Sequence, residues 1–473
     1  MKIYNSLTRR KDEVREKRIG MYVCGPTVYD DPHIGHARSA YIFDIIVKYL
    51  RFRGFRVIFV RNITDIDDKI INRAKSEKGG GSLKEKSERI ADKYLKVYEE
   101  DTARLGLAKP DHEPKATRAI PDIIEFIEIL MKKGYAYTAG GSVYFDVRKF
   151  KDYGKLSGQS PDEMEEGARV SPDKNKKDPL DFALWKASGE GEPSWKSPWG
   201  EGRPGWHIEC SVMSTKFLGN DFLIHGGGLD LTFPHHENEI AQTEAAGKKS
   251  AKYWVHNGLL TIDGQKMSKS LGNFITIRDF EAKYGDLDFL KLLFLSSHYR
   301  HPVDYTAEKI GEAAGMKERI LIFTENAKDG SPGRPFGFAQ GRQAPGPSVK
   351  KEIDNLKDRF IEAMDGDFNT PKALAVIFEL VTLGNKSIGR GDIRSALEVK
   401  KLLSEICGCL GLSLKRGAVD PEFEKKVKPL IEARNAARGN KDFKKADEIR
   451  EKLLKEGIVL EDTREGTVWR RRL

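Results

Sequence analysis

The stretch that decides the fold of this chain reads Met21-Tyr22-Val23-Cys24-Gly25-Pro26-Thr27-Val28-Tyr29-Asp30-Asp31-Pro32-His33-Ile34-Gly35-His36. It begins inside an apolar run over 19–24, which predicts a buried strand, and continues into a turn rich in glycine, proline and aspartate. Apolar residues then recur at helical spacing over 36–53, Gly54 supplies a stop, and 55–60 is again strand-like. A strand, a helix and a strand in this order predict an α/β protein with a doubly wound parallel sheet, whose ligands bind at the carboxyl ends of the strands.

The composition limits the class of protein. A chain of 473 residues exceeds one compact core and predicts three or four domains of about 100–200 residues each. No apolar run reaches the ~18 residues of a membrane span, and the start lacks the apolar core of a signal peptide, so we expect no membrane partner. Four scattered cysteines predict no disulfide framework and favour a reducing, cytoplasmic location. The net charge of +10 favours a polyanionic partner, although solubility alone would also account for it.

Two motifs indicate a site for phosphate groups. His33 and His36 lie where the first strand gives way to the helix, a place whose backbone N–H groups favour phosphate, and Gly35 lets the backbone come close. Lys266 and Lys269 follow about 230 residues later on a loop between two glycines, from which they can close over the same phosphates. Taken alone, the histidines could be capping residues or metal ligands and the lysines an ordinary solvated loop. The two motifs in this order favour a nucleotide site.

A second glycine-rich segment supports this interpretation. The apolar run Phe222-Leu223-Ile224 predicts a strand, and His225-Gly226-Gly227-Gly228-Leu229-Asp230 follows it directly. Glycines just after a strand suit a backbone that approaches a ligand closely. A plain tight turn is the alternative.

Four residues form a candidate metal set: Cys24, Cys210, His235 and Glu239. If the segment after Pro234 is helical, His235 and Glu239 stand four residues apart on one helix face. Two thiolates, an imidazole and a carboxylate suit zinc, and mixed ligands are more typical of catalytic than of structural zinc sites. The spacing is too dispersed to decide alone, since the cysteines could be buried thiols and His235 a satisfied core histidine.

These motifs resemble those of the cysteinyl-tRNA synthetases, which are class I aminoacyl-tRNA synthetases. The matching segments are 21–36, 61–68, 205–210, 233–239 and Lys266-Met267-Ser268-Lys269-Ser270. The resemblance implies that ATP is held by His33, His36, Lys266 and Lys269, which would be catalytic, and by Gly35, Gly226, Gly227 and Asp230. It implies one zinc ion per chain on Cys24, Cys210, His235 and Glu239. It also implies a cysteine pocket that includes Gly25, Thr64, Trp206 and His225.

The resemblance gives the metal a role in choosing the substrate. Zinc prefers a soft thiolate to a hydroxyl, so a substrate thiol bound to zinc would gain energy that serine cannot match. Such a site would need no separate editing domain. Trp206 would close over the substrate and Thr64 would lie near its amino group, although both could equally be packing residues.

The resemblance also divides the chain. A Rossmann-like catalytic domain would occupy 1–110 and 200–265, with a proline-rich connective insertion at 111–199 between its halves. The lysine loop and a stem-contact region would follow at 266–305, then a helical bundle at 306–412 that includes a flexible linker at 329–347, and finally an anticodon-binding module at 421–473.

The final segment bears on RNA binding. It holds 15 Lys and Arg against 11 Asp and Glu, and Phe443 and Trp469 could stack on unpaired bases. A solvated helical hairpin with one tryptophan in its core is the alternative. In the stem-contact region Lys291 stands where many members of the family have arginine. This difference weakens the expectation that the region contacts the tRNA stem and leaves the other expectations intact.

The activity implied is cysteine–tRNA ligation: cysteine and ATP, accompanied by Mg²⁺, give cysteinyl-adenylate, and the acyl group then moves to the 3′ end of tRNA(Cys). The family also implies a monomer. One alternative is a cysteine-activating ligase that acts on an amino sugar, which the intact tail disfavours. A second is a non-catalytic, zinc-stabilised RNA-binding protein, which the intact histidine and lysine pairs disfavour.

Overall fold

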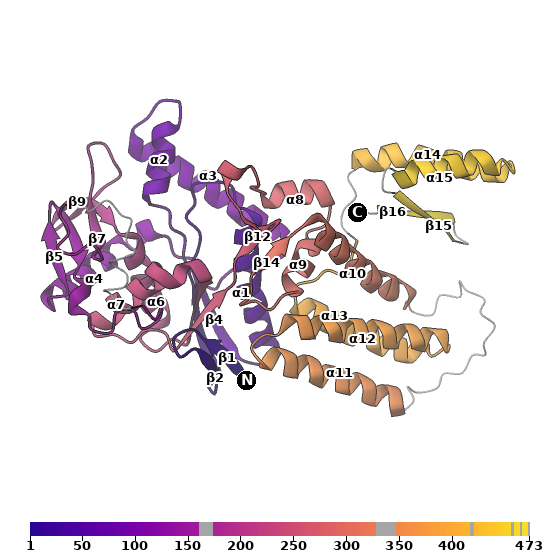
Figure 1. Cartoon of the computed structure of the whole chain (residues 1–473), viewed down its shortest axis with the longest axis horizontal. Coiled ribbons are helices and arrows are strands. Elements are labelled where there is room, and N and C mark those ends of the chain that lie inside the picture. Colours follow the sequence, from indigo (N-terminus) through magenta and orange to yellow (C-terminus); the bar gives the residue numbers. More distant parts are fainter. Residues whose placement is uncertain (160–173, 328–346, 417–420, 456–457, 464–465, 472–473) are drawn as a thin grey trace.

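The computed structural model describes residues 1–159, 174–327, 347–416, 421–455, 458–463 and 466–471 (Figure 1). Its centre is a four-stranded parallel sheet in the order β11-β10-β3-β4, which confirms the predicted doubly wound α/β fold. The strands are β3 (Arg18–Val23), β4 (Arg56–Arg61), β10 (Ile224–Gly228) and β11 (Tyr253–Asn257). Helix α1 (Ile34–Phe52) packs on one face of the sheet and α6 (Trp206–Leu218) on the other.

The residues of β3 show why this strand lies in the middle of the sheet. Met21 and Val23 point into the core shared with α1, whereas Tyr22 points into the core shared with α6. All three side chains are buried because a parallel sheet covered by helices on both faces excludes water from both. The continuous apolar run, rather than an alternating one, is the sequence signature of that position.

The structure corrects one local prediction. The glycines 226–228 lie within β10 and do not follow it as a turn, since they pair with Val255–Asn257 of β11 and Gly226 also pairs with Val23 of β3. Neighbouring strands on both sides supply the hydrogen bonds that keep this segment extended. Glycine is needed here because neighbouring rings pack directly against the backbone. A Cβ on Gly226 would lie 2.2 Å from the ring of Phe43, and a Cβ on Gly227 would lie 2.8 Å from the ring of His236.

The inserted region forms its own antiparallel sheet in the order β5-β6-β7-β9-β8. Its elements are α4 (Ile120–Lys132), β5 (Ala136–Ala139), β6 (Ser142–Phe145), β7 (Phe182–Ala187), β8 (Trp195–Ser197) and β9 (Gly200–Pro204), so this sheet continues to residue 204, past the boundary expected at 199. Glu237, at the start of α7 (Glu237–Ala245), accepts hydrogen bonds from the backbone N–H groups of Gly154, Leu156 and Ser157. The insertion is thereby fixed to the helix that carries Glu239.

Further elements complete the N-terminal part of the chain. A hairpin of β1 (Lys2–Asn5) and β2 (Arg10–Glu13) opens the chain and contacts β11, and the helices α2 (Asp68–Ser76) and α3 (Leu83–Arg104) pack against each other. After β11 come β12 (Leu260–Ile262), β13 (Gln265–Lys266), α8 (Ile277–Tyr284), α9 (Asp288–Leu295) and β14 (Val303–Tyr305). Strand β12 pairs antiparallel with β13 and parallel with β14, which makes the lysine loop part of a small separate sheet.

Helices dominate the C-terminal half. They are α10 (Ala307–Asn326), α11 (Pro347–Asp365), α12 (Thr370–Gly389) and α13 (Ile393–Cys409). The linker expected at 329–347 lies outside the described residues except for Pro347, the first residue of α11. Lys291 is 5% exposed and donates to Asp288 and to the carbonyl of Gly411, so this lysine belongs to the junction between α9 and the bundle.

The last described residues form a small module of α14 (Pro421–Gly439), α15 (Phe443–Lys455) and a hairpin of β15 (Ile458–Thr463) and β16 (Gly466–Arg471). Its core joins Val427, Ile431, Leu453, Ile458 and Leu460. Phe443 is 61% exposed at the first residue of α15, where it is open to a partner. Within the described part of the chain, no helix combines the length and the hydropathy needed to cross a membrane.

Candidate functional site

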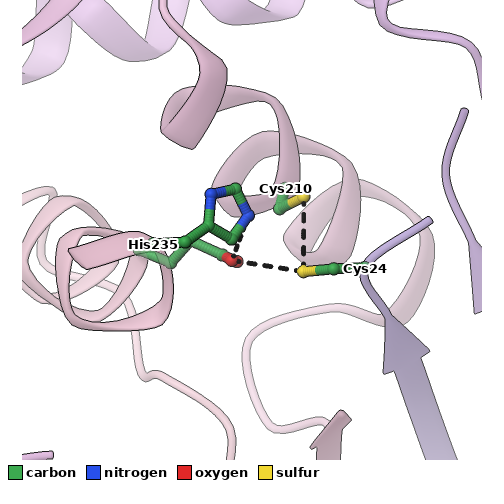
Figure 2. A group of neighbouring side chains, drawn as sticks. Cys24, Cys210 and His235 are labelled. Carbon is green, nitrogen blue, oxygen red and sulfur yellow. Dashed lines mark hydrogen bonds and ion pairs between the residues drawn. The ribbon is translucent and has the colours of Figure 1, made fainter. Parts of the chain in front are cut away.

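The four residues of the predicted metal set meet at the carboxyl end of β3. Cys24 directly follows this strand, and Cys210 lies on α6. His235 lies in the helical turn Thr232–His236, and Glu239 lies in the first turn of α7. Their ligand atoms all lie within 4.8 Å of one another. Figure 2 shows the side chains of Cys24, Cys210 and His235 pointing toward one another from these separate elements.

The distances between these atoms fit a tetrahedral zinc ion. Ligands about 2.3 Å (sulfur) and 2.0–2.1 Å (oxygen, nitrogen) from zinc stand about 3.8 Å apart for two sulfurs, 3.5 Å for sulfur and oxygen and 3.3 Å for oxygen and nitrogen. The Sγ atoms of Cys24 and Cys210 are 3.6 Å apart, and Cys24 Sγ is 3.4 Å from Glu239 Oε1. His235 Nε2 is 3.1 Å from the same oxygen. The side chains therefore hold a geometry that one zinc ion would satisfy.

The ionisable groups of this cluster influence one another. Burial would lower the pKa of His235, but Glu239 and Cys210 raise it to about 10, and burial raises the pKa of Cys24. Burial alone would raise the pKa of Glu239, but the imidazoles of His225 and His235 lower it to about 2. Burial would likewise raise the pKa of Cys210, but its contacts with Cys24 and His235 lower it to about 6. Glu239 Oε2 is buried without a hydrogen-bond partner, even though His225 Nε2 lies 3.3 Å away, outside hydrogen-bond geometry. A carboxylate oxygen left unsatisfied in the interior is costly unless a cation binds it.

A second group of possible ligands overlaps the first. Cys24 Sγ lies 3.4 Å from His225 Nε2 and 3.3 Å from His236 Nε2, and these three atoms with Glu239 also fall within 4.8 Å of one another. His236 Nδ1 is 2.8 Å from His256 Nε2, so a further histidine orients its ring. The first set includes both thiols, the softer ligands that zinc prefers, and leaves these imidazoles around it.

The residues expected to bind the substrate surround this cluster. Trp206 is 36% exposed at the start of α6, and its ring centroid lies 4.2 Å from that of His235. Thr64 is buried and donates its hydroxyl hydrogen to Glu209 at 2.8 Å. The N–H of Gly25 donates to the side chain of Asn62 at 2.8 Å, and a Cβ on Gly25 would strike the backbone of Asn62.

The two histidines of the phosphate motif lie at the N-terminus of α1, with stacked rings whose centroids are 3.7 Å apart. Burial lowers the pKa of His33 to about 4 and also lowers the pKa of His36, although His36 as a residue is exposed. His33 Nδ1 accepts from the N–H groups of Gly35 and His36, and His36 Nδ1 accepts from the N–H of His33. Both rings are therefore neutral with Nδ1 bare, which assigns the proton to Nε2 and makes Nε2–H the donor available to a ligand.

The lysine loop lies beside these histidines. Lys266 is exposed in β13, and Lys269 begins the turn Lys269–Leu271, where its ammonium pairs with the carboxylate of Asp30. Met267 lies 3.3 Å from where a Cβ on Gly35 would stand, so the loop covers the start of α1. Asp230 is exposed in the turn Leu229–Leu231, directly after β10.

Sequence reasoning missed several residues of this site. His207 Nδ1 lies 2.9 Å from His235 Nδ1, and Asn62, Glu209, His236 and His256 complete the polar network around the cluster. His207, Glu209 and His236 lie in the segments 205–210 and 233–239, which also contain predicted ligands. This closeness in sequence was the available signal. No such signal marks His256, which reaches the site from β11.

Comparison with known proteins identifies the class. The family model described as the class I (C) tRNA synthetase catalytic domain matches residues 10–315, a DALR domain matches 359–415, and the cysteinyl-tRNA ligase anticodon binding domain matches 420–470. Among solved structures, methionyl-tRNA synthetase of Mycobacterium tuberculosis in complex with methionyl-adenylate has a TM-score of 0.58 at 15% identity, over 84% of this chain and 90% of that one. A putative arginyl-tRNA synthetase of Campylobacter jejuni has a TM-score of 0.55 at 14% identity, over 85% and 94%. The fold is that of a class I aminoacyl-tRNA synthetase.

The relatives make the assignment specific. The cysteine–tRNA ligase of Thermodesulfovibrio yellowstonii is 49% identical over 99% of both chains, and that of Clostridioides difficile is 48% identical over the whole of both. That of Thermococcus onnurineus is 46% identical over 100% of this chain and 99% of the relative. This chain belongs to the cysteine–tRNA ligase family.

Proposed function

We propose that the protein activates L-cysteine with ATP and transfers it to the 3′ end of tRNA(Cys), and that a zinc ion on Cys24, Cys210, His235 and Glu239 selects the substrate thiol. The observation that carries this proposal is the buried cluster of two thiols, an imidazole and a partly orphaned carboxylate beside a histidine and lysine phosphate site. Bound zinc would supply a Lewis acid that prefers a thiolate to a hydroxyl.

The residues of the chain account for the first chemical step. The substrate carboxylate would attack the α-phosphorus of ATP, accompanied by Mg²⁺, and pyrophosphate would leave. The Nε2–H groups of His33 and His36 would donate to phosphate oxygens as negative charge develops on them, and Lys266 and Lys269 would add positive charge. No protein nucleophile is needed, because positioning and electrostatic stabilisation suffice.

The second step would use the C-terminal module. The ribose hydroxyl at the 3′ end of tRNA would attack the carbonyl carbon of the cysteinyl-adenylate, and AMP would leave. Matches to the DALR and anticodon binding domains support tRNA as the partner. The monomeric state stays a prediction of the family resemblance, and the cytoplasmic location stays a prediction from the four scattered cysteines.

Pyrophosphate exchange tests the activation step. The purified protein should exchange labelled pyrophosphate into ATP when cysteine is present and should discriminate against serine by ~10⁴-fold or more, as sites that hold a polar substrate group do. Removal of the metal should abolish the exchange, and added zinc should restore it. Equal exchange with serine, or full activity in a metal-free preparation, would contradict the proposal.

A truncation separates the tRNA enzyme from the amino-sugar ligase. A chain that ends at residue 416 lacks the module but keeps every residue of the two sites, so cysteine-dependent exchange should persist. Its KM for tRNA should rise steeply at low salt. If phosphate contacts contribute, the difference from the intact protein should shrink at high salt, because salt weakens the contacts that only the intact protein makes. Unchanged charging of tRNA by the truncated protein would favour the amino-sugar ligase instead.

A further inference from the structure

A buried arginine lies two residues after His36, and among the described residues it has no acidic partner. Arg38 is 1% exposed on α1, and its guanidinium donates to main-chain carbonyl groups. Burial lowers the pKa of Arg38 to about 10, which leaves it a cation at neutral pH. A buried charge that is held by carbonyl groups alone costs free energy, which suggests that Arg38 has a role beyond packing.

The carbonyls that Arg38 binds come from two segments. Nη1 donates to Gly258 at 2.6 Å and also to Leu259, directly before β12. Nη2 donates to His301 at 2.5 Å and lies 3.5 Å from the carbonyl of Tyr299, just before β14. The planar guanidinium can serve all these acceptors at once, which a lysine ammonium on its flexible chain cannot do.

These two segments are the base of the lysine loop. Strand β12 pairs with β14 on one side and with β13, which contains Lys266, on the other. In Figure 1, β12 lies beside α1, and β14 lies next to β12. The chains also approach closely here, since a Cβ on Gly258 would lie 2.3 Å from the carbonyl oxygen of His301. Arg38 therefore joins the helix of the phosphate histidines to the strands that carry the lysines.

The far end of the loop is attached to the same helix. The N–H of Ile34 donates to the carbonyl of Ile275 at 3.1 Å, and that of Ile277 donates to Pro32 at 3.3 Å. Residues 260–274 are thus tied at both ends to the first turns of α1 while Lys266 at the tip is exposed. At the end next to β12, side chains make the contacts with α1: the guanidinium of Arg38 donates to Gly258, and the hydroxyl of Ser39 donates to the side chain of Asn257.

We propose that Arg38 is a positioning residue for adenylate formation: it fixes the base of the lysine loop on α1, so that Lys266 and Lys269 reach the same phosphates as His33 and His36. This inference rests on the proposed function. Arg38 itself touches no substrate. Its loss would displace the lysines by a small distance, and a misplacement of about 1 Å can cost ~10²-fold in rate.

Pyrophosphate exchange with Arg38→Lys and Arg38→Met tests the proposal. We expect kcat to fall by ~10²-fold in Arg38→Met and by less in Arg38→Lys, while the zinc content and the KM for cysteine stay unchanged. Lys317→Met is the control, because it removes another buried cation that donates to a main-chain carbonyl. This cation lies at the junction of α9 with the bundle, where it also pairs with Asp288. Melting temperatures of all variants measure the structural cost separately.

The outcomes are distinct. The proposal is overturned if Arg38→Lys and Arg38→Met lose no more kcat than Lys317→Met at an equal loss of stability, or if their loss appears in zinc content or in the KM for cysteine. If Arg38→Met does not fold, Gly258→Ala displaces the same contact from the other side and should show the same loss of kcat. A wild-type protein without cysteine-dependent exchange would instead contradict the proposed function.

Discussion

Two buried clusters of charged groups in this protein are built in opposite ways. At the junction of α9 with the bundle, Asp288 accepts from Lys291 at 2.8 Å, from Lys317 at 2.5 Å and from the N–H of Ser413 at 2.8 Å. Both lysines also donate to carbonyl groups, so every charge is paired. At the end of β3, by contrast, thiols face each other and Glu239 keeps a buried oxygen without a hydrogen-bond partner.

The difference separates a structural cluster from a binding site. A fully satisfied ion group gains nothing from a further ligand, and breaking it costs stability because a charge is left buried. A cluster with unsatisfied donor atoms gains from a cation that accepts their lone pairs. Burial and charge alone therefore do not mark a site. The added sign at the end of β3 is an unsatisfied carboxylate oxygen within a group of possible metal ligands.

The largest effect is expected from Cys210→Ser. The change removes a thiolate ligand, so zinc content and cysteine-dependent pyrophosphate exchange should both be lost. Even the loss of a residue that only hydrogen-bonds to a metal ligand lowers metal affinity by ~10–100-fold. Metal analysis and exchange assays check this. Cys407→Ser is the control: this thiol is equally buried but lies in the bundle, and zinc content should not change. Retention of zinc by Cys210→Ser would contradict the assigned ligand set.

Asp288→Ala should destabilise the protein without affecting the metal. It leaves Lys291 and Lys317 buried without their counter-ion, which should lower the free energy of unfolding by about 3–5 kcal/mol. Urea denaturation measures the loss, and the zinc content should equal that of the wild type. Loss of zinc in this variant would mean that the two clusters are coupled.

A smaller effect is expected from His207→Ala. The ring of His207 contacts His235 through a pair of Nδ1 atoms 2.9 Å apart, so it orients a ligand without binding the metal itself. Zinc affinity should fall by ~10–100-fold, measured by competition with a chelator, and excess zinc should restore activity. Unchanged affinity would show that His207 only packs against the site.

The smallest effect concerns pH. Burial would raise the pKa of Asp288, but the charges of Lys291 and Lys317 hold it below its usual value. A lowered pKa contributes stability that is complete above the unfolded value of about 3.9 and is lost as the pH falls through the folded one. The stability difference between the wild type and Asp288→Asn should therefore shrink below about pH 4. A constant difference in urea midpoints down to pH 3 would contradict this account.

Much of the fold could be predicted because its signals are local. Contiguous apolar patterns predict the strand that ends at Val23, the helix after His33 and the strand that follows it. Gly54 predicts where the helix ends. Local patterns were less informative where partners decide the outcome. The sequence predicted that the glycines of β10 follow a strand, and only their pairing with β11 and β3 makes them part of it.

The sequence by itself determined the sheet type, the two phosphate motifs and the four residues proposed as zinc ligands, since residue type and order are enough to propose them. Only the tertiary structure decided which atoms meet. It brought Cys24 and Cys210 together across 186 positions, added His225, His236 and His256 around them, and placed Lys291 in a buried ion group. It also gave Arg38 its carbonyl partners from positions more than 200 residues away. The physical reason is that such contacts depend on how strands and helices pack, and packing joins segments whose separation along the chain carries no signal of their meeting.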